Sequence, residues 1–456
     1  MNNDNIDAKT TSPMLTEQWF SLLRCPQTQQ PLTRNNDLLL TPEQKLSYPI
    51  INNIPWLLAN PTHSVVDWSI KLNHFTQVVS REVQSLTQQA AASSGLTQQR
   101  LIALAEGKAR FFQDVKALMQ PLLTAKVASK ALYDTLSDRA PNTQNLLSYE
   151  ANLYRDWVWG EQENAAYKAM VVPLLPETPA PKLAVLGGGA GRLAYDLACN
   201  IEDGLVINID INPLLMFAAK AILFGDGLAI DEFPFHPKDL TSIAVRHQID
   251  SIDYSKDNLK LLFADGARPA IEKGSMDAVI TPWLIDIQPL ALAKFLRSLN
   301  NYLSVGGTWI NFGSLVFQQQ RESLCYSIDE IKALAARCGF EITVLDSQEI
   351  PYLKSPYNAG YRMETVWVWQ AKKVADVALA EDPQHLPQWI LEDSIPIPNT
   401  NAIKNAAFSH ALYAELLKQV DGKRSLASIT RKFARENHVD PKEAYQLIKD
   451  FFLKLT

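Results

Sequence analysis

The segment 183–216 constrains the fold of this chain more than any other part of it. An apolar run at 183–186 leads into a turn rich in glycine, and residues 192–199 then show the apolar spacing of a helix. A second apolar run ends in Asp210, roughly 20 residues beyond the first glycine, as in a βαβ unit that binds a nucleotide. An ordinary tight turn is the alternative. The order of strand, glycines, helix, strand and acid favours the nucleotide unit.

The glycines at 187, 189 and 191 have the spacing GxGxG. Glycine allows a ligand to approach the backbone closely and tolerates positive φ angles. We expect the Asp210 carboxylate to face a ribose. The spacing alone leaves both a dinucleotide and S-adenosylmethionine open as the cofactor.

Length and charge restrict the class of protein. The 456 residues allow two to four domains, and 47% hydrophobic content supports a sizeable core. The formal net charge of -6 provides no general field for a nucleic acid or an anionic membrane. We therefore expect no nucleic-acid partner.

The chain shows no targeting or membrane signal. No apolar stretch reaches the ~18 residues of a membrane span, and residues 1–13 are polar. These features predict a cytoplasmic protein without a membrane partner.

The four cysteines lack paired spacing. Cys25, Cys199, Cys325 and Cys338 are scattered, which favours buried reduced thiols over disulfides or a metal site. We predict no metal.

Residues 14–60 form a candidate small module with a hairpin and a Pro-bounded strand. The phrases LLRCP and YPIINNIPWLL resemble a zinc-ribbon-like activator module associated with tRNA methyltransferases. Cys25 stands alone and Thr28 occupies the place of a second cysteine, so four-ligand zinc binding is excluded here. We expect a degenerate module that provides a packing or partner surface.

Residues 64–140 are predicted to be helical. The clearest pattern covers 97–123, with Thr97 as a candidate N-cap. Nothing in this region indicates chemistry, and we expect it to flank the catalytic core.

Polar side chains follow several predicted core strands. Asp265 and Gly266 follow the run at 261–263, and Trp283 and Asp286 follow the run at 278–281. Loops at the carboxyl ends of strands build the site in an open α/β sheet.

The remaining elements complete an α/β pattern. The segment GTWINFGSLVF predicts a fifth strand, 291–303 and 327–338 predict helices, and 340–345 and 361–372 predict a terminal strand pair. Ser327 and Glu330 fit a capping box. This order is that of a Rossmann-like class I methyltransferase core.

Residues 145–373 resemble the carnosine N-methyltransferase-like family. The resemblance is carried by RDW at 155–157, GGGAGRLAYDLA, DINPLLM, FPFHP, WLID and GGTWINFGSLVFQ, in order along the chain. It implies S-adenosylmethionine as the cofactor and favours it over a dinucleotide.

The resemblance assigns cofactor-binding roles to particular residues. Arg155 of RDW and Asn152, where the family usually has Gln, would hold the methionine end of the cofactor. The glycine loop, Asp210 and Asp265 would hold the nucleoside, although Glu is commoner at 210. Gly266 and Pro282 complete the predicted cofactor site.

The resemblance also implies an acceptor site. Asp286 and Tyr361 match the family's substrate-binding acid and tyrosine, but Gln318 stands where the family has histidine. An amide carries no charge near neutral pH, so an acceptor other than carnosine becomes credible. A loop cap and a core aromatic are the structural alternatives for Asp286 and Tyr361.

Residues 383–456 resemble a PqqD-like module, a small winged-helix fold that binds leader peptides. The phrases DGKRSLASI and VDPKEAYQLIKDFFLKL carry the resemblance. Peptide binding would use strand addition. A winged helix used for packing or dimerisation is the alternative.

Three functions remain open. The first is an N-methyltransferase that acts on a peptide or peptide-like acceptor, such as a histidine imidazole, in the modification of ribosomally made natural products. The second is a methyltransferase of a small imidazole dipeptide, and the third is a non-catalytic scaffold that binds the cofactor. The sequence leaves the oligomeric state open.

Overall fold

The computed structural model describes residues 17–42, 46–59, 61–125, 145–252, 254–288, 291–317, 322–379, 394–397 and 411–453. The chain divides into two units. One comprises Met1–Ala59, Glu82–Met119 and Tyr149–Leu379, and the other comprises Asn60–Arg81, Gln120–Ser148 and Ala380–Thr456.

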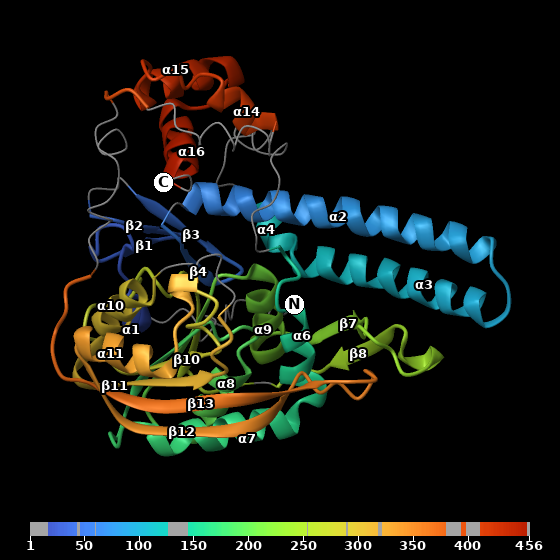
Figure 1. Ribbon diagram of the computed structural model, residues 1–456, viewed down its shortest axis with the longest axis horizontal. Coiled ribbons are helices and arrows are strands. Elements are labelled where there is room, and N and C mark those ends of the chain that lie inside the picture. Colours follow the sequence, from blue (N-terminus) through green and yellow to red (C-terminus); the bar gives the residue numbers. More distant parts are fainter. Residues whose placement is uncertain are drawn as a thin grey trace, which may run out of the picture. The chain divides into compact units, whose positions relative to one another are not determined.

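A mixed sheet forms the centre of the first unit (Figure 1). Its core strands follow the order β9-β6-β5-β10-β11-β13-β12. All neighbouring pairs as far as β11 are parallel, and β13 runs antiparallel between β11 and β12. The strands are β5 (Lys182–Leu186), β6 (Leu205–Asp210), β9 (Leu259–Ala264), β10 (Met276–Pro282), β11 (Leu303–Gly313), β12 (Phe340–Tyr352) and β13 (Arg362–Lys373). This order confirms the predicted α/β, Rossmann-like methyltransferase class.

The N-terminal residues extend this sheet at its β9 edge. Here β4 pairs in parallel with β9, and the rings of Trp56 and Phe263 stack with their centroids 3.8 Å apart. The segment consists of α1 (Glu17–Phe20), β1 (Thr33–Asn35), β2 (Leu38–Leu40), β3 (Ser47–Ile51) and β4 (Ile54–Leu57). The sequence predicts a hairpin and a strand here, but it does not predict their attachment to the sheet.

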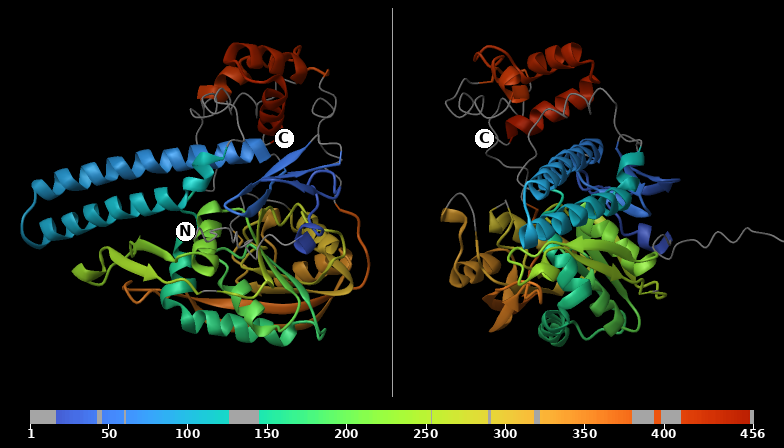
Figure 2. Two further views of the ribbon diagram at one scale, coloured as in Figure 1. Left: turned by 180° about the vertical axis from the view of Figure 1, so that it is seen from behind. Right: turned by 90° about the vertical axis from the view of Figure 1, so that its right-hand side faces the viewer.

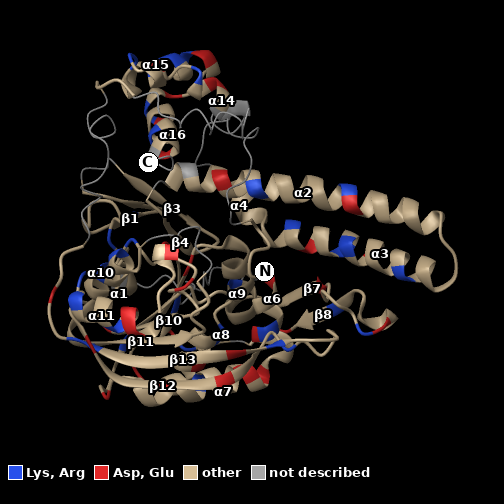
Figure 3. Ribbon diagram, viewed as in Figure 1, with Lys and Arg blue, Asp and Glu red and all other residues tan. Residues whose placement is uncertain are grey.

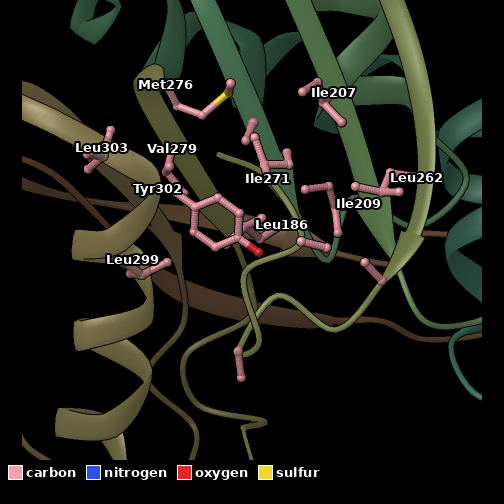
Figure 4. Close-up of a cluster of buried hydrophobic side chains, with 14 of the residues drawn as sticks. Leu186, Ile207, Ile209, Leu262, Ile271, Met276, Val279, Leu299, Tyr302 and Leu303 are labelled. Atoms are coloured by element: carbon pink, nitrogen blue, oxygen red, sulfur yellow. The ribbon is translucent and has the colours of Figure 1, made fainter. Parts of the chain in front are cut away.

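Helices cover the core strands. They are α7 (Glu161–Val171), α8 (Arg192–Asn200), α9 (Pro213–Phe224), α10 (Leu292–Tyr302) and α11 (Ile328–Arg337). Among them, α9 is apolar and buried over most of its length. The predicted capping box of Ser327 and Glu330 starts α11. Figure 4 shows Leu186 and Val279 of two adjacent strands gathered with Leu299 and Tyr302 of α10 in one buried cluster. Burial of this apolar surface holds the helix on the sheet.

Two long helices precede the core. They are α2 (Pro61–Ala91) and α3 (Gly95–Leu118). The second half of α2 runs beside α3 (Figures 1 and 2), and Leu86, Ala90, Leu101 and Ala105 are buried there in one cluster. The predicted cap at Thr97 is wrong, because Ser94 occupies the N-cap position. Basic and acidic residues are interspersed along α3, with basic residues in excess (Figure 3).

Short elements connect these helices to the core. The sequence does not predict the antiparallel pair β7 and β8, which lies between α9 and β9 in the chain. The elements are α4 (Gln120–Thr124), α6 (Glu150–Tyr154), the π-helix η2 (Arg155–Trp159), η3 (Val172–Leu174), β7 (Leu228–Glu232), η4 (Leu240–Ser242), β8 (Val245–Ile249) and η5 (Glu322–Leu324).

The second unit has its own apolar core. Its C-terminal helices are α14 (Ala411–Leu417), α15 (Leu426–Asn437) and α16 (Pro441–Leu453). Leu426, Phe433 and Phe452 pack there together with Val66 and Ile70 from the start of α2. Residues 383–393 and 398–410 of the predicted winged-helix domain lie outside the described residues.

None of the helices in the described ranges is both long and apolar enough to cross a membrane.

Candidate active site

The glycine loop lies at the carboxyl end of β5, where the sequence predicts it. The amides of Gly187 and Gly188 both donate to Ile209 O, at 2.8 and 3.2 Å. Gly189 N donates to Asp210 Oδ2 at 2.8 Å. The loop is therefore fixed to the end of β6, the neighbouring strand.

Gly188 is the most tightly constrained glycine of the loop. A Cβ at Gly188 would lie 1.9 Å from Asn208 Oδ1, whereas a Cβ at Gly189 would meet only Leu215 Cδ1, at 3.7 Å. The three predicted glycines all have positive φ angles, with values of 69° at Gly187, 53° at Gly189 and 82° at Gly191. The sequence pattern does not single out Gly188, because its neighbour Asn208 is 20 residues away in the chain.

Two acids lie at the carboxyl ends of adjacent strands. Asp210 ends β6 and is paired in register with Phe263 of β9, two residues before Asp265. Desolvation raises the pKa of both carboxyl groups. Backbone amides partly offset this effect, since Asn212 N donates to Asp210 at 2.8 Å and Ala267 N donates to Asp265 at 2.9 Å. The pair can accept hydrogen bonds from hydroxyl and amino groups of a nucleoside.

Arg155 lies in the π-helix η2, an irregularity that is frequent at functional sites. Its Nε and Nη2 donate to Asp156 Oδ1 at 2.9 and 2.7 Å. Burial alone would lower the pKa of this guanidinium, but the Asp156 carboxylate raises it, so Arg155 stays charged. Within the described part of the chain, no hydrogen bond uses Nη1, which can donate to a ligand carboxylate.

The RDW segment contacts the glycine loop directly. Trp157 Nε1 donates to Ala190 O at 2.9 Å, and Arg192 Nη1 donates to Asp156 O at 2.9 Å. Asn152 is partly buried, and its backbone N–H donates to Tyr149 O at 3.0 Å. The structure thus brings the predicted methionine-end residues to the same end of the sheet as the predicted nucleoside-binding residues.

Asp286 lies in the loop that follows β10, beyond Pro282. It is 4% exposed, and its Oδ2 accepts the amide of Val316 at 3.2 Å. Desolvation raises the pKa of Asp286 to about 6, and the charge of Glu364 adds to this effect. Asp286 can therefore act as a proton acceptor near neutral pH.

Tyr149, which the sequence pattern does not single out, is affected by the charges of both Asp286 and Asp210. Desolvation raises the pKa of its phenol, and the charges of Asp286 and Asp210 raise it further. Both carboxylates therefore lie within electrostatic range of one side chain, which is 44% exposed. Its φ of 66° is unusual for a residue other than glycine, but nothing in the sequence around it indicates this conformation.

The other predicted acceptor residues are less central in the structure. Tyr361 is 52% exposed, and Lys354 Nζ lies 4.9 Å from its ring centroid. Gln318 lies outside the described residues. Gly266 packs against the end of β5, since a Cβ there would lie 3.4 Å from Leu186 Cβ.

The cysteines do not gather at a site. Cys25 and Cys338 are buried, but Cys325 is partly exposed and Cys199 is exposed, so the prediction of buried thiols is wrong for Cys199. Cys25 Sγ lies 3.1 Å from Tyr48 OH. Among the described residues, no three His, Cys, Asp or Glu side chains could together hold a metal ion.

Comparisons with known proteins identify the family of the chain. The model of the carnosine N-methyltransferase family matches residues 137–375. A carnosine N-methyltransferase of Dictyostelium discoideum is 26% identical over 189 residues, which cover 36% of this chain. The chain spans 39% of the length of that relative.

Solved structures give only weak overall similarity. A methyltransferase of Thermotoga maritima that depends on S-adenosylmethionine has a TM-score of 0.31 at 15% identity, covering 50% of this chain and 98% of its own. A phosphoethanolamine N-methyltransferase of Haemonchus contortus has a TM-score of 0.33 at 12% identity. The match covers 51% of this chain and 60% of that enzyme. We therefore assign the fold from the strand order.

The glycine loop, the paired acids and Arg155 suit S-adenosyl-L-methionine, which carries a nucleoside and a carboxylate. The matching family model covers more than half of the 456 residues. The chain belongs to the carnosine N-methyltransferase family, whose enzymes are S-adenosylmethionine-dependent methyltransferases.

Proposed function

We propose that this protein is an S-adenosylmethionine-dependent N-methyltransferase that methylates the imidazole of a histidine in a peptide. The observation that carries the proposal is Asp286, a buried acid with a pKa near 6 at the carboxyl end of β10. Because β10 pairs with β5, this acid follows the strand adjacent to the one that leads into the glycine loop.

The cofactor supplies a methyl group bonded to a positively charged sulfur. Arg155 Nη1 would bind its carboxylate, Asp210 its ribose and Asp265 its adenine amino group. Hydrogen bonds from the amides of Gly187, Gly188 and Gly189 hold the loop against the end of β6. Preorganisation of this kind reduces the entropic cost of alignment.

Asp286 would act on the acceptor ring. As a carboxylate it accepts the N–H of one ring nitrogen, so the other nitrogen presents its lone pair toward the methyl group. When bound, the cofactor would supply its methyl group to that nitrogen, and the carbon–sulfur bond would break with its electrons left on sulfur. The Asp286 carboxylate would stabilise the positive charge that develops on the ring and would then take the N–H proton, which leaves the methylated ring neutral.

The proposed peptide acceptor draws support from the second unit. Helices α14 and α15 border a pocket of about 450 Å³, lined by Lys418, Gln419 and Lys432 among others. Gln419 is 8% exposed, and its Oε1 has no hydrogen-bond partner within the described ranges. We propose that this unit binds a leader peptide of a ribosomally made natural product.

A small imidazole dipeptide is the second candidate acceptor. The name of the Dictyostelium discoideum relative, carnosine N-methyltransferase, favours it. Such a substrate would make no use of the second unit.

Mass spectrometry with labelled cofactor tests the proposal. The intact protein is incubated with carnosine and with histidine-containing peptides, some of which carry a leader. We expect a mass gain of one methyl group on an imidazole, and its loss in Asp286→Asn. Methylation at another atom, or none in any histidine-containing peptide, would refute the proposal. Methylation of carnosine alone would favour the dipeptide, and methylation of neither carnosine nor a peptide would favour the non-catalytic scaffold.

Charge reversal at Lys418 and Lys432 distinguishes the two acceptors. Both side chains are exposed, whereas removal of residues 383–456 would uncover Val66 and Ile70. If a leader binds here, Lys418→Glu with Lys432→Glu should weaken methylation of leader-bearing peptide and leave carnosine unaffected. If the double variant methylates the leader-bearing peptide as well as the wild type does, the dipeptide is favoured as the acceptor.

A further inference from the structure

Trp283, the first residue after β10, has a strained backbone. Its φ is 41°, a conformation that bulky residues rarely adopt and that usually persists only where surrounding contacts enforce it. The amide of Trp283 donates to Phe312 O at 2.8 Å. A Cβ at Gly313 would lie 3.0 Å from both N and Cα of Trp283. The end of β11 therefore holds the Trp283 backbone closely.

Three aromatic rings surround the Trp283 side chain. The centroids of Tyr167, Phe312 and Tyr352 lie 4.7, 5.1 and 5.8 Å from the indole. The polar edge of the indole faces Glu364, because Nε1 donates to Glu364 Oε2 at 3.1 Å. The three rings and the hydrogen bond to Glu364 together determine the orientation of the Trp283 indole.

Glu364 is a buried carboxylate of β13 that uses both its oxygens. It is 7% exposed, with Oε2 bonded to Trp283 and Oε1 paired with Arg362 Nε. Arg362 is largely exposed, so it neutralises the charge from the solvent side. A buried carboxylate with two partners is costly to build, and function is a frequent reason for one.

The loop after β10 connects Trp283 to Asp286. Leu284 and Ile285, the two residues between them, are buried at 8% and 3% exposure. Displacement of Trp283 would therefore displace Asp286 as well. In addition, the Glu364 charge acts on Asp286 directly.

We propose that Glu364 is a positioning residue: it holds Trp283, and through this residue the loop that carries Asp286, in place for the acceptor. This inference rests on the proposed function, because it assumes that the acceptor binds beside Asp286. It assigns a role to a residue that neither the sequence pattern nor the family resemblance singles out.

Glu364→Ala and Glu364→Gln are the test variants. The amide of Gln can still accept the indole N–H, whereas Ala cannot. Glu349→Gln is the matched control, because Glu349 is exposed on β12, opposite Thr365, the residue next to Glu364. Comparison of melting temperatures identifies any variant that fails to fold.

Kinetics provide the first readout. Glu364→Ala should raise the acceptor KM about tenfold, the effect of one hydrogen bond to a charged group. Binding of S-adenosylhomocysteine should stay within about twofold of wild type. In Glu364→Gln, the acid limb of kcat/KM should move to lower pH, because loss of the negative charge lowers the pKa of Asp286.

A double-mutant cycle tests whether Glu364 acts through the indole. Trp283→Phe keeps an aromatic ring but removes the N–H donor. In that background, Glu364→Ala should change KM less than about twofold. Full additivity, or a wild-type KM in Glu364→Ala, would overturn the proposal.

Nuclear magnetic resonance provides a readout without activity. The indole ¹⁵N–¹H signal that disappears in Trp283→Phe belongs to Trp283, and it should shift in Glu364→Ala and stay in place in Glu349→Gln. If the wild type methylates no acceptor, the proposed function fails, but this signal still reports the contact. An unchanged signal in Glu364→Ala would refute the inference even in an active enzyme.

Discussion

The carboxylate of Asp210 accepts the backbone amide of Gly189 at 2.8 Å, which joins the acid at the end of β6 to the glycine loop after β5. We expect Asp210→Ala to weaken S-adenosylhomocysteine binding by roughly 10- to 100-fold, because a hydrogen bond to a charged group and the order of the loop are both lost. Isothermal titration calorimetry measures this change. Asp203→Ala, an exposed acid before β6, is the control and should bind normally.

Asp286 should oppose stability when it is ionised. Its pKa in the folded chain is about 6, above the ordinary 3.8, so stability falls as pH rises between these values. Asp286→Asn should raise the free energy of unfolding near pH 7.5 by up to about 3 kcal/mol and abolish activity. Below a pH of about 3, urea titrations of the two proteins should converge, since the group is then protonated in both the folded and the unfolded state. A gain that persists in acid would contradict this explanation.

The pH dependence of activity follows from the same group. We expect kcat/KM to decline below a pH of about 6, because Asp286 loses the charge that orients the acceptor. An acceptor imidazole that titrates near 6.5 adds to this decline. A rate that stays flat from about pH 7.5 to 5 would be incompatible with a role for the carboxylate.

Gly188 has no room for a side chain. In Gly188→Ala, the new Cβ would collide with Asn208 Oδ1, so the loop or the strand must move, at a cost of about 1 to 3 kcal/mol. We expect lower thermal stability together with at least about tenfold weaker S-adenosylhomocysteine binding. Gly306→Ala is the control. Its Cβ would meet nothing within 4 Å, so its positive φ should cost stability without affecting the cofactor.

The N-terminal segment between α1 and β1 contacts the loop that carries Asp265. Arg24 N donates to Ala270 O at 2.9 Å, and the Arg24 side chain pairs with Glu272. We expect Arg24→Ala to weaken S-adenosylhomocysteine binding about threefold by loosening this loop. A cycle with Glu272→Ala should show a coupling of about 1 kcal/mol in unfolding experiments. A coupling of zero would mean that the ion pair between Arg24 and Glu272 does not contribute to stability.

Local interactions make part of this protein predictable from sequence. The strand, glycine loop, helix and acid of 183–210 lie where the pattern predicts them, as does the capping box of Ser327 and Glu330. These features depend on residues close together in the chain, so composition and spacing are sufficient to reveal them. Thr97 is the exception, since helix α3 begins two residues earlier, at Gly95.

Contacts between residues far apart in the chain depend on how the segments pack, so spacing along the sequence does not reveal them. Trp283 and Glu364 are 81 residues apart, and β4 joins β9 across about 200 residues. The electrostatic link of Tyr149 to both Asp210 and Asp286 exists only once three separate segments have packed together. The order of residues along the chain sets which chemical groups stand at the ends of the strands. Packing decided which of these groups are desolvated and paired, and therefore which of them can act on a ligand.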